Sequence, residues 1–141
     1  MDFKIVALEA TTVAGYLIQT TMTEVATNNP IPAFWASLAD KGDFCYGVCD
    51  MQSMEDMNYI VARCGRDKAE LAEGMVEFTI PAGEWLVQEI PLAEIGISYG
   101  KANEWMEQNG YTWAHGASFE KYDERMSTKG LLDLYVPIIK K

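Results

Sequence analysis

A short series of motifs occurs twice in this chain, in the same order in each half, and this repeat restricts the possible folds more than any other feature. The first copy reads VAGYL at 13–17, YGVCD at 46–50 and NYIV at 58–61. The second copy reads PAGEWL at 81–86, FEKYD at 119–123 and LYVP at 134–137. The gaps between motifs differ only by loop-sized amounts, so we expect both halves to fold into the same unit.

Each half also carries one predicted helix between its first and second motifs. In the first half the helix follows Asn28-Asn29-Pro30, ends at Lys41-Gly42 and has apolar residues at helical spacing. In the second half similar spacing extends from 92 to 106, and Asn109-Gly110 is a good helix end. These apolar positions are Ile31, Phe34, Trp35 and Leu38 in the first half, and Leu92, Ile95, Tyr99, Ala102, Trp105 and Met106 in the second.

Extended segments at 3–8 and 76–80 precede the first motif of each half, so each half reads strand–helix–strand–strand. The last two strands of each half are separated by acidic turn segments, 52–56 and 124–130. A half of about 70 residues has a thin core by itself. We therefore expect one α+β domain over 1–141, with repeats at about 1–72 and 73–141. The halves would share one antiparallel sheet around a pseudo-two-fold axis, with both helices on one face and a ligand cleft between them.

Charge and hydropathy exclude several classes of function. The 11 basic and 21 acidic side chains give a net charge of −10, which repels phosphate backbones and anionic membranes. The N-terminal segment lacks the pattern of a signal peptide, and no window has the ~20 apolar residues that span a bilayer. We expect a cytoplasmic protein that binds neither nucleic acid nor membrane directly, with a possible protein partner and an undetermined oligomeric state.

The three cysteines, Cys45, Cys49 and Cys64, are an odd number in a chain without the density of a disulfide scaffold. This count favours a reducing compartment and buried free thiols. Cys45 and Cys49 would lie about 13 Å apart on one strand, too far for one zinc ion. His115 is the single histidine, so we expect no metal site and no cofactor.

The ordered set of motifs resembles the GyrI-like effector-binding domain, which also forms the ligand-binding half of AraC-type and MerR-type multidrug regulators. The resemblance covers essentially the whole chain. Its most specific pieces are the FE-x-YD motif at 119–123, the closing Y-x-PI at 135–138, the IPAG turn at 80–83 and Trp105. The chain begins directly at its first predicted strand, so we expect no DNA-binding module.

The resemblance implies a cleft for bulky, apolar, often cationic compounds. It places Glu120 in an aromatic-lined pocket in contact with the ligand, and Tyr135 beside it. Gly47 matches Glu120 in the first half, so one acidic group is expected in the site. From the residues alone, Glu120 could instead be a surface carboxylate paired with Lys121 or Arg125.

Further aromatic residues are assigned to the same pocket, although each could equally be ordinary core. Trp35 and Trp105 lie on predicted helix faces, Trp85 follows the Gly83 turn, and Tyr59 lies on a strand. Tyr46 and Tyr99 complete the predicted set. The methionines at 51, 54 and 57 could be hairpin filler or an adaptable wall for varied ligands.

Three functions remain open. The first is a stand-alone binding module for amphipathic, cationic small molecules, with Glu120 as the counter-charge. The second is a hydrolase of electrophilic, cyclopropane-type genotoxic compounds, with Glu120 as base and Tyr135 as proton donor. The third is an inhibitor-type module that docks on a basic protein through its acidic surface.

Overall fold

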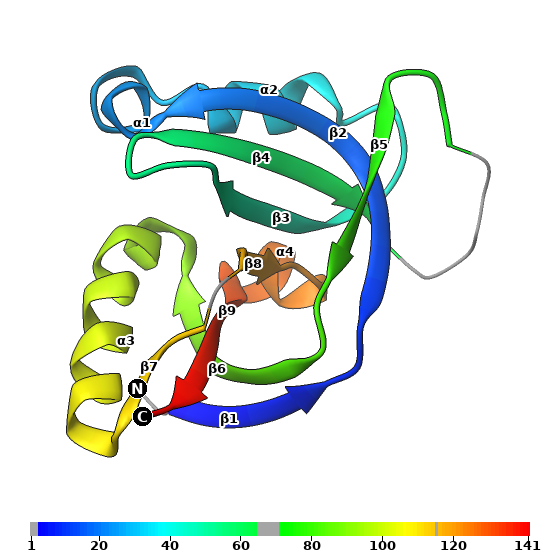
Figure 1. The fold of residues 1–141 in the computed structure, drawn as a ribbon. Coiled ribbons are helices and arrows are strands. Elements are labelled where there is room, and N and C mark those ends of the chain that lie inside the picture. The colour runs from blue at the N-terminus through cyan, green and yellow to red at the C-terminus, as the bar shows by residue number, and fades with distance from the viewer. Residues whose placement is uncertain (1–2, 65–70, 115) are drawn as a thin grey trace.

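A computed structural model describes residues 3–64, 71–114 and 116–141 (Figure 1). The described elements, in chain order, are β1 (Phe3–Leu8), β2 (Thr11–Thr21), α1 (Met22–Asn28), α2 (Ile31–Ser37), β3 (Phe44–Met51), β4 (Asp56–Arg63), β5 (Met75–Ile80), β6 (Gly83–Pro91), the 3₁₀ turn η1 (Leu92–Glu94), α3 (Ile95–Asn109), β7 (Tyr111–Trp113), β8 (Ser118–Lys121), α4 (Glu124–Lys129) and β9 (Leu131–Lys140).

The strands form one antiparallel sheet in the order β1-β6-β9-β8-β3-β4-β2-β5, with β7 paired to β9. The order is symmetric about the β3–β8 pair, because β8, β9 and β6 on one side match β3, β4 and β2 on the other. The outer strands are exchanged: β1 of the first half pairs with β6, and β5 of the second half pairs with β2. The predicted α+β fold with one shared antiparallel sheet is confirmed.

The helices cover one face of this sheet. At the top of Figure 1, α1 and α2 lie across β2 and β4, while α3 lies beside β6 and β7. Ile31, Phe34 and Trp35 of α2 pack on Tyr59 and Val61 of β4. On the other side of the sheet centre, α3 packs through Ala102 and Met106 on the apolar side chains of β6 and β9. The two predicted helices therefore stand over different halves of the sheet.

Side chains alternate between two cores along each strand. On β4, Tyr59 and Val61 point to the helices, whereas Ile60 and Ala62 point to the opposite core. That opposite core also holds Trp85, Phe119 and five other buried residues. A side chain's position in the alternation thus decides whether it can reach the space between the helices.

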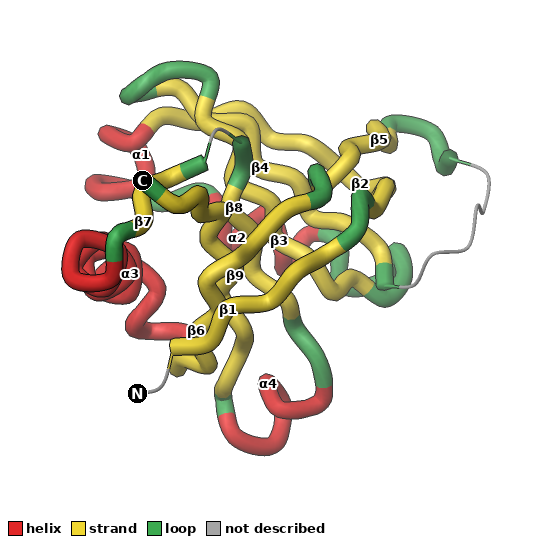
Figure 2. Tube along the Cα trace, turned by 60° about the horizontal axis from the view of Figure 1, so that its bottom comes forward, coloured by secondary structure: helices red, strands yellow, loops and turns green. Residues whose placement is uncertain are grey.

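One local prediction is wrong. The segment 124–130 is not a loop: α4 forms there, because the Asp123 side chain accepts a hydrogen bond from the Arg125 backbone N–H and Gly130 ends the helix at φ 69°. Figure 2 shows α4 as a short helix at the bottom of the view, away from α3. Gly15 lies within β2, opposite Ala62, where a Cβ would collide with the Val61 backbone.

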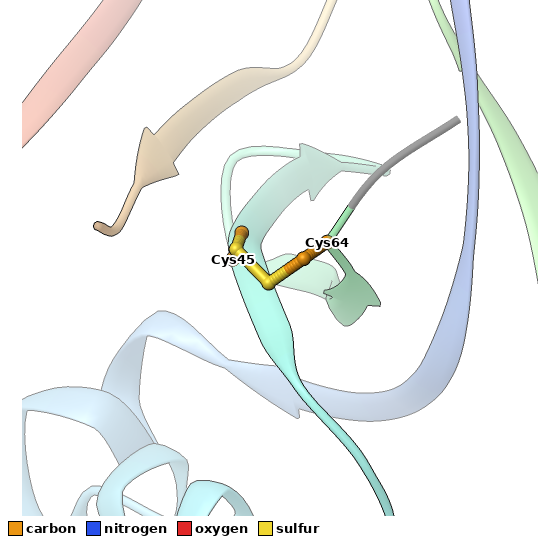
Figure 3. Close-up of a disulfide and its surroundings, with 2 residues drawn as sticks. All are labelled: Cys45 and Cys64. Carbon is orange, nitrogen blue, oxygen red and sulfur yellow. A yellow bond between two sulfur atoms is a disulfide. The ribbon is translucent and has the colours of Figure 1, made fainter. Parts of the chain in front are cut away.

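The expectation of three free thiols is also wrong, because Cys45 and Cys64 form a disulfide with their Cα atoms 4.7 Å apart (Figure 3). The pairing of β3 with β4 brings these residues together although they are 19 positions apart. Cys45 lies at an irregularity in that pairing, between Phe44 and Tyr46. Cys49 is the free cysteine. The cysteine count therefore gives no argument for a reducing compartment.

Within the described residues, no helix is long and apolar enough to cross a membrane. The same residues contain no group of three or more His, Cys, Asp or Glu side chains placed to hold a metal ion.

Candidate functional site

A cleft of about 1710 Å³ opens on the helix-covered face of the sheet. Its walls come from α1 and α2 on one side and from η1, α3 and β7 on the other, and β3, β4 and β8 form its floor. Five methionines, at 22, 51, 54, 57 and 126, line it together with several aromatic rings. Its described lining includes the acidic residues Asp43, Glu120, Asp123 and Glu124 but no Lys or Arg.

Glu120 lies at the floor of this cleft with 4% of its surface exposed. Its Oε1 atom accepts hydrogen bonds from the Tyr59 phenol at 2.8 Å and from the Tyr122 phenol at 2.7 Å. The Cys49 thiol lies 3.7 Å from Oε2, as a weak donor. Three donors from two strands and the segment after β8 thus hold the carboxylate in one orientation.

A second layer of aromatic contacts holds these donors. The Trp35 indole N–H donates to the Tyr59 oxygen at 3.0 Å, and the Trp35 ring packs edge-on against Tyr122 at 5.0 Å. On the α3 side, the Tyr99 hydroxyl and Ser118 Oγ share a hydrogen bond of 2.8 Å. Tyr99 also stacks on Trp113, with ring centres 6.2 Å apart. Side chains from both halves of the chain therefore surround Glu120.

Burial and hydrogen bonding act in opposite directions on the pKa of Glu120, and burial has the larger effect. Burial raises the pKa of Glu120, while the hydrogen bonds from Tyr122, Tyr59 and Cys49 lower it and favour the carboxylate. Burial, and then the charge of Glu120, raises the pKa of all three donors, so they remain protonated. Among the described residues, no Lys or Arg forms an ion pair with Glu120.

The alternative in which Glu120 is a surface carboxylate paired with Arg125 is wrong. Arg125 binds Glu89, Asp123 and Asp133 instead, at 2.6 to 2.8 Å. Lys121 lies on the opposite face of β8, since it follows Glu120 directly on the strand. The structure therefore directs the Glu120 side chain into the cleft and the nearby cations away from it.

Of the predicted site residues, the structure brings Glu120, Tyr59, Tyr99 and Trp35 together in the cleft lining. It does not bring Tyr135, Trp85 or Tyr46 there. Tyr135 pairs with Phe119 across β8 and β9, and its ring stacks on Phe119 at 4.4 Å. Trp85 and Tyr46 also contact Phe119. These three rings belong to the core on the face opposite Glu120.

Tyr135 was assigned to the pocket through the closing Y-x-PI motif of the family, and the strand register places its side chain elsewhere. Val61 pairs with Gly47, and Leu134 pairs with Glu120, so Leu134 is the structural equivalent of Val61. The sequence comparison instead aligned Tyr59 with Tyr135, which is an offset of three residues. An odd offset on a strand places the side chain on the other face.

Trp105 is also outside the cleft lining. Its ring packs against Phe3 and Tyr111, at centre distances of 5.9 and 5.6 Å. These contacts join α3 to β1 and β7, so the role of Trp105 in this structure is packing.

Four residues of the site were not predicted: Tyr122, Cys49, Ser118 and Trp113. Ser118, Glu120 and Tyr122 are two residues apart and face the same way, so strand alternation applied to Glu120 would have indicated Tyr122. No comparable signal exists for Trp113, because β7 joins the sheet through β9 at its edge.

The sequence profile of Cass2, described as integron-associated effector binding protein, matches residues 4–138. Three solved structures share the fold. SAV2435 bound to tetraphenylphosphonium has a TM-score of 0.78 and 16% identity, over 99% of this chain and 94% of that one. Integron cassette protein VCH_CASS2 from Vibrio cholerae has a TM-score of 0.70 and 14% identity, over 97% and 95%. The EcmrR C-terminal domain has a TM-score of 0.62 and 13% identity, over 99% and 98%.

A more distant similarity links the chain to a hydrolase from Listeria innocua, encoded by lin2189, with a TM-score of 0.54 and 8% identity, over 97% of this chain and 91% of that chain. No curated protein sequence matches. At these identities the solved structures establish the fold alone.

Proposed function

The chain belongs to the integron-associated effector binding protein family, which is GyrI-like, and on this premise we propose that it binds bulky, amphipathic cations in its cleft. The observation that carries the proposal is Glu120, 4% exposed and hydrogen-bonded as a carboxylate. A buried charge without a partner is costly. A cation in the cleft would provide the missing partner.

The walls suit the rest of such a ligand. Aromatic rings at Trp35, Tyr99 and Trp113 offer faces and edges to a cation and its substituents. A cation over an aromatic face gains about 0.5–2 kcal/mol, depending on desolvation. The methionines that line the cleft are unbranched and polarizable, so they can adapt to ligands of different shape. Binding of tetraphenylphosphonium by SAV2435, a protein of the same fold, supports this class of ligand.

The test is a calorimetric titration with two ions of the same shape and opposite charge, tetraphenylphosphonium and tetraphenylborate. The phosphonium should bind and the borate should bind far more weakly, because both fill the same apolar space but only one is attracted by Glu120. Equal affinity for both ions would show that the charge of Glu120 does not contribute to binding. Failure of both to bind would reject the proposed ligand class.

A hydrolase is the second candidate, favoured by the arrangement around Glu120. Oε1 takes both phenol hydrogen bonds, which leaves Oε2 with only the weak Cys49 donor. A carboxylate with a raised pKa and a free lone pair can accept a proton from water. Incubation with a cyclopropane-bearing electrophile, followed by mass spectrometry, distinguishes the two: a water adduct that forms with the native protein but not with Glu120→Gln supports hydrolysis.

A further inference from the structure

The walls of the cleft form two apolar groups, one from each half of the molecule. The first group includes Ile31 and Trp35 of α2, which pack with the cluster on β4. The second includes Ile95 and Tyr99 of α3, which pack with the cluster on β6 and β9. Figure 1 shows these helices over different halves of the sheet, with β3 and β8 between them.

Glu120 lies between the two groups. Its strand, β8, and the facing strand, β3, are the two middle strands of the order, and Glu120 pairs directly with Gly47 across them. Because Gly47 is the equivalent position in the other half, the charge is not duplicated. Of the four acidic residues in the described lining, Glu120 is therefore the one that lies on the two middle strands.

Each wall is connected to the floor near this carboxylate. Trp35 reaches Glu120 through the Tyr59 hydroxyl, by hydrogen bonds of 3.0 and 2.8 Å. From the other side, Tyr99 reaches Ser118, which lies two residues before Glu120 on the same face of β8. An aromatic surface thus begins on both sides of one negative charge.

The size of the cleft allows both walls to be covered at once. Its volume of about 1710 Å³ exceeds the range of roughly 300–1,000 Å³ that is usual for small-molecule pockets. A ligand with its charge at one end, placed on Glu120, would cover one wall and leave the other in water. A ligand with its charge in the middle could remove apolar surface from water on both sides.

This geometry deepens the proposed function and rests on it. We infer that the preferred ligand carries its positive charge centrally, with an apolar or aromatic arm on each side, rather than at one end. The central charge lies over Glu120, one arm contacts the α2 wall around Trp35, and the other contacts the α3 wall around Tyr99 and Trp113.

Two isomeric quaternary ammonium ions test this arrangement by calorimetry. Dimethyl-bis(phenylpropyl)ammonium has one phenyl arm on each side of nitrogen, and trimethyl(diphenylpentyl)ammonium has both phenyl groups on one side. The two-armed ion should bind about tenfold more tightly, with one ion per chain. Equal or tighter binding of the one-armed ion, or two one-armed ions bound per chain, would overturn the inference.

Variants on each wall give a second readout. Trp35→Leu and Trp113→Leu should each lower the affinity for the two-armed ion. Only one of the two variants should strongly lower the affinity for the one-armed ion. Trp113 is 38% exposed, so its variant should fold even if Trp35→Leu does not. Ile97→Ala is the control, because Ile97 is exposed on α3 outside the cleft lining. If both variants lower the affinity for the two isomers by the same factor, the two-wall arrangement is wrong.

The outcomes separate this inference from the proposed function. If neither ion binds, both are rejected. If both ions bind equally and both are weakened by Glu120→Gln, the cation site stands and only the central position of the charge is rejected.

Discussion

Gly47 on β3 lies directly opposite Glu120 on β8, and the missing side chain of the glycine provides the space in which Tyr59 meets the carboxylate. A Cβ atom on Gly47 would stand 2.6 Å from Glu120 Oε1 and even closer to the Tyr59 hydroxyl oxygen. The position in the first half that corresponds to Glu120 therefore has no side chain of its own, and the Tyr59 hydroxyl group fills the space beside it.

Gly47→Ala should therefore separate Tyr59 from Glu120. Overpacking of a buried site typically costs about 1–3 kcal/mol, so urea denaturation should show a lower free energy of unfolding. Affinity for tetraphenylphosphonium should also fall, because Glu120 loses its fixed orientation. Gly96→Ala is the matched control, since Gly96 lines the cleft with open space at its Cβ position. Unchanged stability and affinity in Gly47→Ala would show that the close packing is not required.

The stability of the protein should depend on pH through Glu120. Burial raises the pKa of Glu120 above its ordinary value of 4.5, so the folded state holds this proton to higher pH than the unfolded state does. The stability that this group contributes is then fully present below pH 4.5 and is lost as pH rises through the folded-state pKa. Glu120→Gln should remove this loss.

The measurement is the free energy of unfolding of both proteins at intervals from pH 4 to pH 8, taken as a difference so that the other carboxyl groups cancel. We expect the free energy of unfolding of Glu120→Gln to increase relative to that of the native protein as pH increases. A difference that stays constant, or that changes in the opposite direction, would show that the hydrogen bonds from Tyr122 and Tyr59 outweigh burial.

Substitution of Tyr59 and of Tyr135 should affect ligand affinity differently, although both residues were predicted for the site. Tyr59→Phe removes a donor from Glu120 and the acceptor of Trp35, so affinity for tetraphenylphosphonium should change by about 1 kcal/mol or more. Tyr135→Phe keeps the ring that stacks on Phe119 and should leave affinity unchanged. Titration of both variants decides this; loss of affinity in Tyr135→Phe alone would reverse the assignment of faces.

The disulfide should contribute to stability independently of the ligand. It closes a loop between Cys45 and Cys64, 19 positions apart, and a loop of this length corresponds to roughly 3 kcal/mol in the chain-entropy description. The double variant Cys45→Ser/Cys64→Ser should lose about this much in urea denaturation, and Cys49→Ser should not. If a reducing agent destabilises the double variant as much as the native protein, the effect does not come from this bond.

The sequence was informative where a pattern depends on local periodicity. Helical spacing at Ile31, Phe34 and Trp35 predicted α2, and Asn109-Gly110 predicted the end of α3, because both signals are contained within a few turns. The repeat predicted a shared sheet, since two thin halves need a common core. The order of motifs was sufficient for this prediction even though the exact alignment of residues was not.

Prediction failed where register or long-range pairing decides the result. Tyr135 was assigned to the pocket from the closing motif of the family, but its register opposite Phe119 on β8 places its side chain on the other face. The Cys45–Cys64 bond depends on how β3 pairs with β4, which composition does not specify. Tyr122 was not predicted although strand alternation from Glu120 indicates it, because its backbone N–H continues the pairing with β3 at the Cys45 carbonyl. Glu120 was placed correctly in the cleft through the family resemblance, not through periodicity.

The most direct test of the account measures the preference for tetraphenylphosphonium over tetraphenylborate in native protein and in Glu120→Gln. Glu77→Gln, which removes the same charge from an exposed position on β5 outside the cleft, is the control. We predict that Glu120→Gln loses about 2 kcal/mol of phosphonium affinity, or about 30-fold, while Glu77→Gln keeps it. If both variants retain the native preference, or lose it equally, Glu120 is not the counter-charge of the site.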